Sequence, residues 1–378
     1  MDKRICAFPA ADYSTGEMDR VVAGHFAALN ADTMLKPGMR VCIKPNLLMK
    51  AAPDQNVTTH PELVAAVIRA LRAMGITDIV IGESPGGPYT KSALEGIYKA
   101  TGMTGAVGAD AALNFDTGYT ALAADKAVIC RAFNVINPVA NADAVINLPK
   151  LKTHGMVMLS AGVKNLLGCV PGLQKPELHF RFGEKDDFCR MLVDLALLIA
   201  PCLTIVDAVD AMEGNGPSAG AIRHTGMTFA AVNPFALDLA LCRYTGMTPD
   251  IVPTVRHAIE SGLCPASADE LDWISDAPAP VGRFILPDSR PHDFSHKLPP
   301  ALKKPFNALV SAFFTSRPAI EKRRCIGCGK CSESCAPGAV TIHERKAVID
   351  YKKCIACYCC HEMCPVQAVK IKRSRLFG

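Results

Sequence analysis

Short apolar runs alternate with longer segments of helical periodicity over roughly the first 260 residues. In one helical segment, residues 61–74, Pro61 follows Thr59 and His60 as at a capped helix start, and Gly75 stands at the expected end. Strands that alternate with helices are typical of an α/β domain with a mostly parallel sheet and flanking helices. We predict such a domain over residues 1–264, with strands at 4–8, 40–44, 78–82, 144–148, 203–207 and 227–232 and helices at 17–35, 61–74, 187–199 and 234–244.

The pattern changes after Cys264, where residues 265–318 are punctuated by prolines. Such a composition predicts a linker between two domains. Within it, the apolar positions of residues 301–314 fall on one helical stripe flanked by Lys303 and Lys304, which predicts an amphipathic helix. We expect this helix to dock one domain on the other, with attachment to a membrane surface as the alternative.

Nine of the seventeen cysteines lie between Cys325 and Cys364, in two runs with the spacing C-x2-C-x2-C-x3-C. Three thiolates on one tight loop suit an iron–sulfur cluster, whose fourth ligand comes from the other run. Structural zinc sites more commonly use cysteine pairs separated by longer gaps. We therefore predict two [4Fe-4S] clusters, one held by Cys325, Cys328, Cys331 and Cys364 and the other by Cys335, Cys354, Cys357 and Cys360, with Cys359 as a non-ligand.

The two cysteine runs belong to an internal repeat, because residues 338–342 after the first run match residues 367–371 after the second. On these motifs, residues 319–373 resemble the bacterial dicluster ferredoxins. The resemblance implies a small α+β domain that transfers electrons. The first run departs from the family pattern, since Ala336 separates Cys335 from Pro337 where the family has Cys-Pro.

Polar residues gather directly after several predicted strands of the first domain. Functional groups of parallel α/β sheets collect in such loops. Lysines there can bind phosphate or carboxylate, and a histidine that titrates near neutrality can donate a proton. We predict a site for a small anionic substrate, with His154, Lys152 and Lys164 as catalytic candidates and Lys44, Asn46, Lys150, Asn165, Asp207, Glu213 and Asn215 as binding candidates.

Each of these candidates also has a purely structural interpretation. A lysine is often a solvated surface charge, and an asparagine often caps a turn. Asp207, Glu213 and Asp238 can orient a lysine, bind a metal or act as a base. No dinucleotide fingerprint supports a nicotinamide or flavin site, since Gly214, Gly216 and Gly220 have G-x-G-x3-G spacing.

The polar segments that begin at Lys44, Lys150 and Gly162 resemble those of a family named for its domain of unknown function 362. The resemblance extends over residues 40–246, and members often carry a ferredoxin-like domain at one end. It implies a shared α/β fold and a shared polar site. It implies no catalytic role for any residue.

Charge is divided unevenly along the chain. Residues 297–378 contain sixteen Lys and Arg against five Asp and Glu, so residues 1–296 are net acidic in a chain of net charge +5. This excess favours an acidic redox partner protein, the acidic first domain or a membrane surface, and we expect no nucleic-acid partner and at most peripheral membrane contact. No apolar segment of signal-peptide length follows Met1, so we expect a cytoplasmic protein.

Two functions remain open from the sequence. The first is an iron–sulfur oxidoreductase that passes electrons between the clusters and a small anionic substrate in the α/β domain. The second is an electron carrier or adaptor without chemistry of its own, which docks a partner redox enzyme. A weaker third alternative is that the N-terminal site handles a metal or assembles a cluster.

Overall fold

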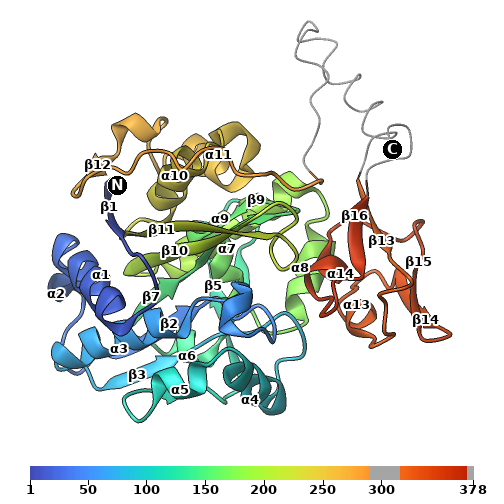
Figure 1. The fold of residues 1–378 in the computed structure, drawn as a ribbon, viewed down its shortest axis with the longest axis horizontal. Coiled ribbons are helices and arrows are strands. Elements are labelled where there is room, and N and C mark those ends of the chain that lie inside the picture. The colour runs from blue at the N-terminus through green and yellow to red at the C-terminus, as the bar shows by residue number, and fades with distance from the viewer. Residues whose placement is uncertain (290–315, 373–378) are drawn as a thin grey trace, which may run out of the picture.

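The computed structural model describes residues 1–289 and 316–372 (Figure 1). A large α/β domain occupies most of the molecule, and a small C-terminal domain lies against one end of it. None of the helices in these two described stretches combines the length and apolar character needed to cross a bilayer.

The central sheet is mostly parallel, as predicted. β11 is antiparallel to both of its neighbours, whereas the other pairs along the main strand order are parallel. β8 (Lys150–His154) pairs with β10 outside this order and also with β9 (Met158–Ser160). The main order is β12 (Asp272–Trp273), β1 (Arg4–Pro9), β11 (Ala221–Ala231), β10 (Leu203–Glu213), β7 (Ala144–Leu148), β2 (Arg40–Pro45), β3 (Asp78–Ile81) and β4 (Ala112–Leu113).

Helices cover both faces of the sheet and form two hydrophobic cores. In β2, Val41 and Ile43 belong to one core and Cys42 to the other, as the two-residue alternation of a strand requires. One face carries α1 (Thr15–Ala28), α2 (Ala31–Met34), α3 (Pro61–Ala73), α4 (Lys91–Ala100) and α5 (Met103–Val107). The other carries α6 (Asn137–Ala140), α7 (Gly162–Asn165), α8 (Gln174–Arg181), α9 (Lys185–Ile199), α10 (Pro234–Thr245) and α11 (Pro253–Glu260).

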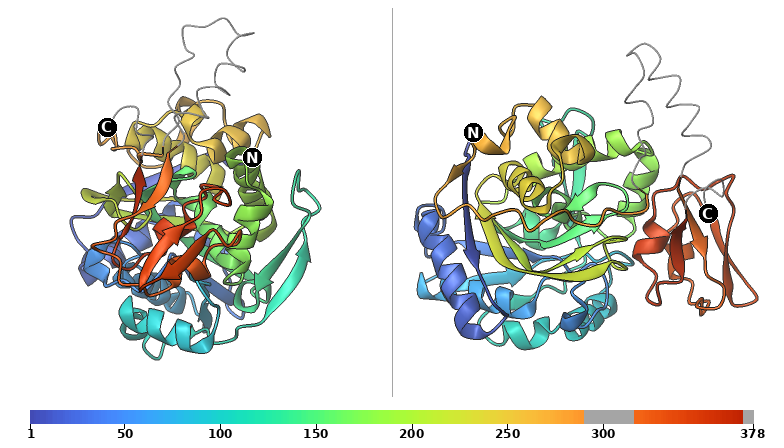
Figure 2. Two further views of the ribbon diagram at one scale, coloured as in Figure 1. Left: turned by 90° about the vertical axis from the view of Figure 1, so that its right-hand side faces the viewer. Right: turned by 45° about the horizontal axis from the view of Figure 1, so that its top comes forward.

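Smaller elements complete the α/β domain. β5 (Tyr119–Ala123) and β6 (Ala132–Ile136) form a separate antiparallel hairpin that projects from the domain in Figure 2. Residues 281–285 of the predicted linker lie along the domain, where Phe284 N–H donates to Thr245 O and Gly214 N–H donates to Ile285 O. Short 3-10 turns occur at Pro53–Gln55, Leu166–Cys169, Pro249–Ile251 and Ala268–Glu270.

Two details of the predicted elements are wrong. The single helix expected at residues 17–35 is divided, because Asn30 adopts a left-handed conformation (φ 53°) between α1 and α2. The polar run Lys150–His154, expected as a loop after a strand, is itself the buried strand β8. Lysines are rarely buried in strands, so its polar pattern does not indicate one.

The small domain repeats one unit twice. Each cysteine run leads into a short helix and then a strand: α13 (Lys330–Glu333) precedes β14 (Val340–His343), and α14 (Cys359–Glu362) precedes β16 (Val369–Lys372). β14 pairs antiparallel with β15 (Lys346–Ile349), and β16 pairs antiparallel with β13 (Arg317–Ile320). The α+β prediction is therefore confirmed. The amphipathic helix expected at residues 301–314 lies outside the described residues.

Candidate functional site

A cavity lies between the two domains, at the carboxyl ends of β2 and β3. It spans about 700 Å³ of space, a part of which is open to solvent. Ser334, Cys359, Glu362 and Met363 of the small domain form one wall of this interdomain cavity. The α/β domain contributes the polar residues Lys44, Asn46, Glu83, Ser84, Lys152, His154, Ser160, Lys164, Asn165, Lys175 and His179.

Hydrogen bonds between the domains hold this wall in place. The Ser218 hydroxyl donates to Glu362 O at 3.0 Å, and the Gln367 amide donates to Ser218 O at 3.3 Å. His361 Nε2 lies 3.1 Å from Asn215 O. The turn between β10 and β11 is thereby joined to α14, which lies within the second cysteine run, and to the segment that follows this run.

Lys152 is fully buried at the cavity wall. Its ammonium donates to Asn46 Oδ1 at 3.0 Å and to Val57 O at 2.6 Å. The Asn46 amide in turn donates to Asn165 Oδ1 at 3.0 Å, and the Asn165 amide donates to Asn147 Oδ1 at 2.8 Å. This chain of amides fixes the direction in which Lys152 presents its charge.

Two lysines of the cavity are poised to exchange protons near neutral pH. Burial lowers the pKa of Lys152 to about 7, and the neighbouring charges of Lys150 and Lys164 act in the same direction. Burial also lowers the pKa of Lys175 to about 7, although Glu83 opposes the shift. A bound anion would favour the protonated form of both amines.

His154 presents a proton toward the small domain. The backbone N–H of Met156 donates to His154 Nδ1 at 3.0 Å, so the proton of the neutral ring is on Nε2. Nε2 lies 3.2 Å from Glu362 Oε1. Burial lowers the pKa of His154; burial alone would raise that of Glu362, but His154 and Lys164 lower it. The Met156 contact therefore indicates a neutral imidazole whose Nε2 proton faces the Glu362 carboxyl group.

The remaining charged groups of the cavity differ in how they are paired. Lys44 and Glu83 form a buried ion pair at 2.5 Å. Burial lowers the pKa of His179 to about 3, so this ring, which stacks on Phe188, stays neutral. Lys164 is only partly buried and has no ion-pair partner within the described stretches of chain. Lys164 is therefore available to bind an anion that enters the cavity.

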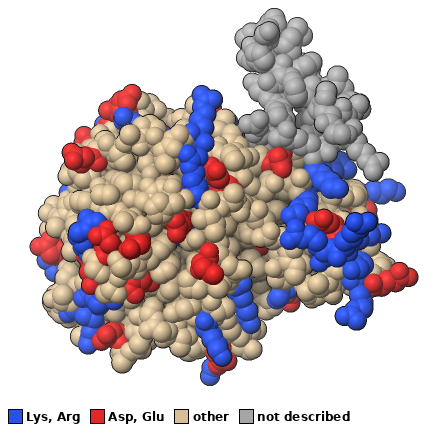
Figure 3. All heavy atoms as spheres, viewed as in Figure 1, with Lys and Arg blue, Asp and Glu red and all other residues tan. Residues whose placement is uncertain are grey.

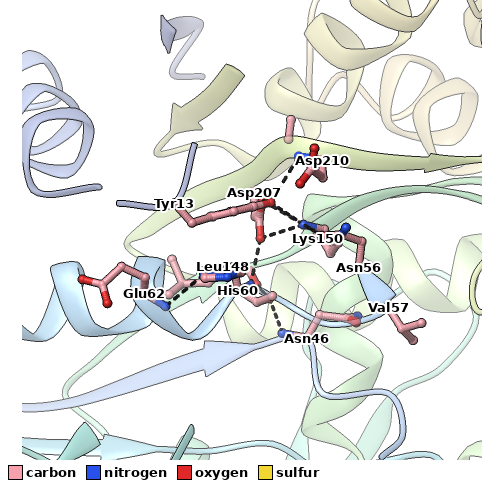
Figure 4. Close-up of polar contacts among 12 residues, drawn as sticks. Tyr13, Asn46, Asn56, Val57, His60, Glu62, Leu148, Lys150, Asp207 and Asp210 are labelled. Atoms are coloured by element: carbon pink, nitrogen blue, oxygen red, sulfur yellow. Dashed lines mark hydrogen bonds and ion pairs between the residues drawn. The ribbon is translucent and has the colours of Figure 1, made fainter. Parts of the chain in front are cut away.

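Lys150 and Asp207 belong to a separate buried cluster beside the cavity (Figure 4). Lys150 Nζ lies 3.1 Å from both carboxylate oxygens of Asp207 and 2.6 Å from the Tyr13 hydroxyl. Asp207 also accepts from the Tyr13 hydroxyl at 2.7 Å and from the backbone N–H of His60 at 2.9 Å. These contacts tie the N-terminal segment, β8 and β10 together.

The structure brings six of the ten predicted α/β site residues to the cavity: Lys44, Asn46, Lys152, His154, Lys164 and Asn165. Of the others, Glu213 pairs with Arg223 at 2.9 Å, and Asn215 lies at the domain interface, where its side chain bonds to Asp288. Asp238 accepts from the backbone N–H of Gly162 at 2.7 Å and so caps α7.

Sequence reasoning missed several residues of the cavity wall. Glu83 and Ser84 stand in a polar run after a predicted strand, but nothing in their spacing distinguished them. Lys175 and His179 lie four residues apart in α8, so helical spacing would have placed them on one face. Glu362 was missed because it comes from the other domain.

The eight predicted ligand cysteines surround two hollows of the small domain. The first hollow, of about 330 Å³, is lined by Cys325, Cys328, Cys331 and Cys364. The second, of about 320 Å³, is lined by Cys335, Cys354, Cys357 and Cys360, and also by Cys359, the predicted non-ligand. Backbone N–H groups point at the sulfurs, from Ala339 to Cys335 at 3.2 Å and from Ala368 to Cys364 at 3.1 Å. The four predicted ligand thiols of each hollow, with amide donors beside them, fit a four-iron cluster.

The second hollow adjoins the interdomain cavity. Ser334 and Cys359 line both spaces. Cys359 lies between the predicted ligands Cys357 and Cys360 in the sequence. A cluster in the second hollow would therefore be separated from the cavity by little more than one layer of side chains.

Residues 324–368 match the family model described as a 4Fe-4S dicluster domain. The chain is therefore an iron–sulfur protein with an electron-transfer domain, and this domain is joined to a larger α/β domain. Residues 41–243, more than half of the chain, match the model described as "Domain of unknown function (DUF362)". The chain belongs to the DUF362 family.

A thylakoid-associated protein of Synechocystis sp. (strain ATCC 27184 / PCC 6803 / Kazusa) is 36% identical over 285 residues, which cover 74% of this chain and 85% of that protein. Two solved structures are much more distant. The lactate racemase apoprotein from Thermoanaerobacterium thermosaccharolyticum has a TM-score of 0.40 at 9% identity and covers 61% of this chain and 54% of its own. A structural-genomics target from Thermotoga maritima has a TM-score of 0.33 at 8% identity. The match covers 53% of this chain and 51% of that protein. Likenesses of this size carry no implication for function.

Proposed function

We propose that the protein is an oxidoreductase that passes electrons between two [4Fe-4S] clusters and a small anionic substrate in the interdomain cavity. The observation that carries this proposal is that Ser334 and Cys359 line both the second cysteine hollow and the cavity. Such clusters supply single electrons, commonly at low potential. The predicted crossed ligation, with Cys335 and Cys364 exchanged between the two runs, is part of the proposal.

The α/β residues have separate roles in this proposal. Lys164 and Lys152 attract the anion, and the amides of Asn46 and Asn165 hold Lys152 in place. The neutral ring of His154 donates a hydrogen bond from Nε2 to the substrate, and the protonated form of Lys152, whose pKa is about 7, is the proton donor. Because an anion favours the charged form of Lys152, its binding draws a proton into the site that offsets added negative charge.

The proposal is tested with the cluster-loaded protein under anaerobic conditions. The clusters are reduced chemically, and their visible absorbance is followed after addition of each member of a panel of small carboxylates and phosphate esters. We expect at least one compound to accelerate reoxidation, and Lys152→Met to slow that reaction at least about tenfold. Lys126→Met, at an exposed position, is the matched control. If no compound accelerates reoxidation, the cavity does not serve electron transfer.

The electron partner in this proposal is an acidic redox protein. Figure 3 shows Lys and Arg side chains gathered on the small domain. Three residues next to the first hollow are exposed, namely Cys328, Ile326 and Lys330. A partner can therefore approach the cluster of the first hollow, here called the outer cluster, at this surface. Basic residues on this surface would attract an acidic electron carrier before it docks. We therefore expect the clusters of the double variant Lys330→Glu, Arg323→Glu to be reduced more slowly by such a carrier, with the largest effect at low salt, where charges are least screened.

A carrier or adaptor without chemistry of its own is the second candidate, and the same basic surface favours it. The Lys152→Met variant distinguishes the two candidate functions. An oxidoreductase loses ligand-dependent reoxidation while its reduction by the acidic carrier is unchanged. An adaptor shows no ligand-dependent reoxidation to lose.

We place the protein in the cytoplasm in this proposal. A reducing compartment suits a chain with seventeen cysteines and a cluster domain. The name of the Synechocystis relative, a thylakoid-associated protein, makes contact with a membrane surface the alternative. Fractionation of cells at low and high salt tests this, since peripheral contact through basic residues is lost at high salt.

A further inference from the structure

Ser84 and Lys175 make a contact for which electron transfer has no use. Ser84 Oγ lies 2.9 Å from Lys175 Nζ, and both residues line the interdomain cavity. Both are buried, with exposed fractions of 1% and 8%. A serine hydroxyl held against a buried amine is the arrangement found in serine nucleophiles that use a lysine as base.

The fold builds this pair from two turns. Ser84 follows β3, and Lys175 stands in the first turn of α8. The backbone N–H of Gly172 donates to Ser84 Oγ at 2.7 Å. Gly172 has φ +31°, and a Cβ atom there would lie 2.8 Å from Gly87 O, so a larger residue would push the turn away from Ser84.

The direction of the hydrogen bond between Ser84 and Lys175 depends on the charge of the amine. In the protonated form, Lys175 Nζ donates to both Ser84 Oγ and Pro85 O, at 2.9 and 3.0 Å, while Gly172 N–H also donates to Ser84 Oγ. Burial lowers the pKa of Lys175 to about 7, so above that pH the amine has a free lone pair. The Ser84 hydroxyl can then donate to Lys175 Nζ, which is the direction of proton transfer that activates the oxygen.

We propose that Ser84 is a nucleophile activated by Lys175, and that it acts on a small ester or thioester that carries a negative charge. Ser84 Oγ bonds to the carbonyl carbon while Lys175 takes the hydroxyl proton. The bond to the leaving alcohol or thiol breaks, and the leaving group takes that proton. Water then attacks the acyl-serine with Lys175 as base, which releases the acid and restores Ser84. No electrons are transferred, so this activity is independent of the proposed redox function.

The negative charge of the substrate follows from the surroundings of the pair. Lys164 and Lys152 line the same cavity, and Lys164 has no ion-pair partner among the residues described. Of the acidic residues of the wall, Glu83 is paired with Lys44, and the Glu362 carboxyl group lies on the side of the small domain, 3.2 Å from His154 Nε2. A substrate anion would therefore meet cations that are free to bind it.

The test is covalent labelling of the cluster-loaded protein with methanesulfonyl fluoride, a small neutral reagent that sulfonylates activated serines. Digestion and mass spectrometry locate the adduct. We expect it on Ser84 and on no other serine of the cavity, at a rate that rises with pH through about 7 and then levels off, because Lys175 must be neutral. Ser160→Ala, at another buried serine of the cavity wall, is the matched control and should label normally.

Lys175→Arg distinguishes a base from a structural anchor. Arginine can donate to Ser84 and Pro85 but stays charged, so it cannot accept the proton. We expect this variant to keep its cluster spectrum and melting temperature and to label at least about a hundredfold more slowly. An unlabelled Ser84 in the wild-type protein, a rate independent of pH, or an arginine variant that labels at the wild-type rate would each overturn the proposal. The pH profile of the wild-type protein decides the matter if the variant does not fold.

Discussion

Among single residues, the two buried lysines of β8 differ most clearly in their surroundings. Lys150 and Lys152 lie two positions apart on one strand and face the same side, yet they have different partners. Lys150 is neutralised by Asp207, whereas Lys152 contacts only neutral oxygens of Asn46 and Val57. We therefore expect Lys150 to stabilise the fold and Lys152 to interact with a ligand of the cavity.

The affinity of the cavity for an anion should depend on pH. In the free protein, Lys152 and Lys175 lose their protons above about pH 7, and a bound anion favours the protonated amines. Sulfate affinity should therefore be flat below about pH 6 and fall by up to about tenfold per pH unit for each lysine above pH 7. Calorimetry in buffers of different ionisation enthalpy measures both the affinity and the protons taken up.

Lys152→Met should reduce both the pH dependence and the proton uptake, and Lys126→Met should change neither. Sulfate binding that is equally strong at pH 6 and pH 9 would show that the lysines do not face the ligand.

The Lys150–Asp207 pair should stabilise the fold. Asp207→Asn leaves the Lys150 ammonium buried without its counterion, which should lower the free energy of unfolding by about 3–5 kcal/mol. The loss is smaller if Lys150 becomes neutral in the variant by releasing its proton. Glu17→Gln removes a surface pair with Arg20 and should lower the free energy of unfolding far less, because solvent screens an exposed pair. Denaturant unfolding compares the two. Equal losses would mean that the buried cluster is not a structural tie.

At the scale of elements, most of the fold could be predicted because apolar periodicity marks buried strands and helices. The segments at β1, β2, β3, β7, β10 and β11 all carry that pattern. β8 could not be recognised, because its burial depends on partners such as Asp207 and Asn46 that lie far away in the sequence. Glu362 could not be predicted as a site residue for the same reason, since only docking of the small domain brings it to His154.

The repeated cysteine element carries a prediction about crossed ligation. Cys335 belongs to the first run but lines the hollow of Cys354, Cys357 and Cys360. Cys335→Ser should therefore impair the second cluster and spare the first, which lowers iron from about eight toward about four atoms per chain. Iron analysis measures the loss, and electron paramagnetic resonance of the reduced variant should show a single cluster without spin coupling to a neighbour.

The matched control is Cys359→Ser, which should retain both clusters because Cys359 is a predicted non-ligand. Full iron content in the Cys335 variant, or loss of a cluster in the Cys359 variant, would contradict the assignment of ligands.

At the scale of the whole molecule, we expect the two domains to provide one path for electrons. The first cysteine hollow lies beside exposed Cys328 and Lys330, and the second adjoins the interdomain cavity through Ser334 and Cys359. Neither domain alone has a complete cavity wall. We therefore expect electrons to move between a docked partner, the outer cluster, the inner cluster and the substrate, in either direction.

A single-turnover experiment tests this account most directly. The fully reduced, cluster-loaded protein is mixed anaerobically with the most effective compound of the panel, and the electrons lost by the clusters are compared with the product formed. The account predicts one electron lost per cluster, an equivalent amount of reduced product, and a rate at least about tenfold lower in Lys152→Met with unchanged cluster content. Reoxidation without product, or an equal rate in Lys152→Met, would contradict it.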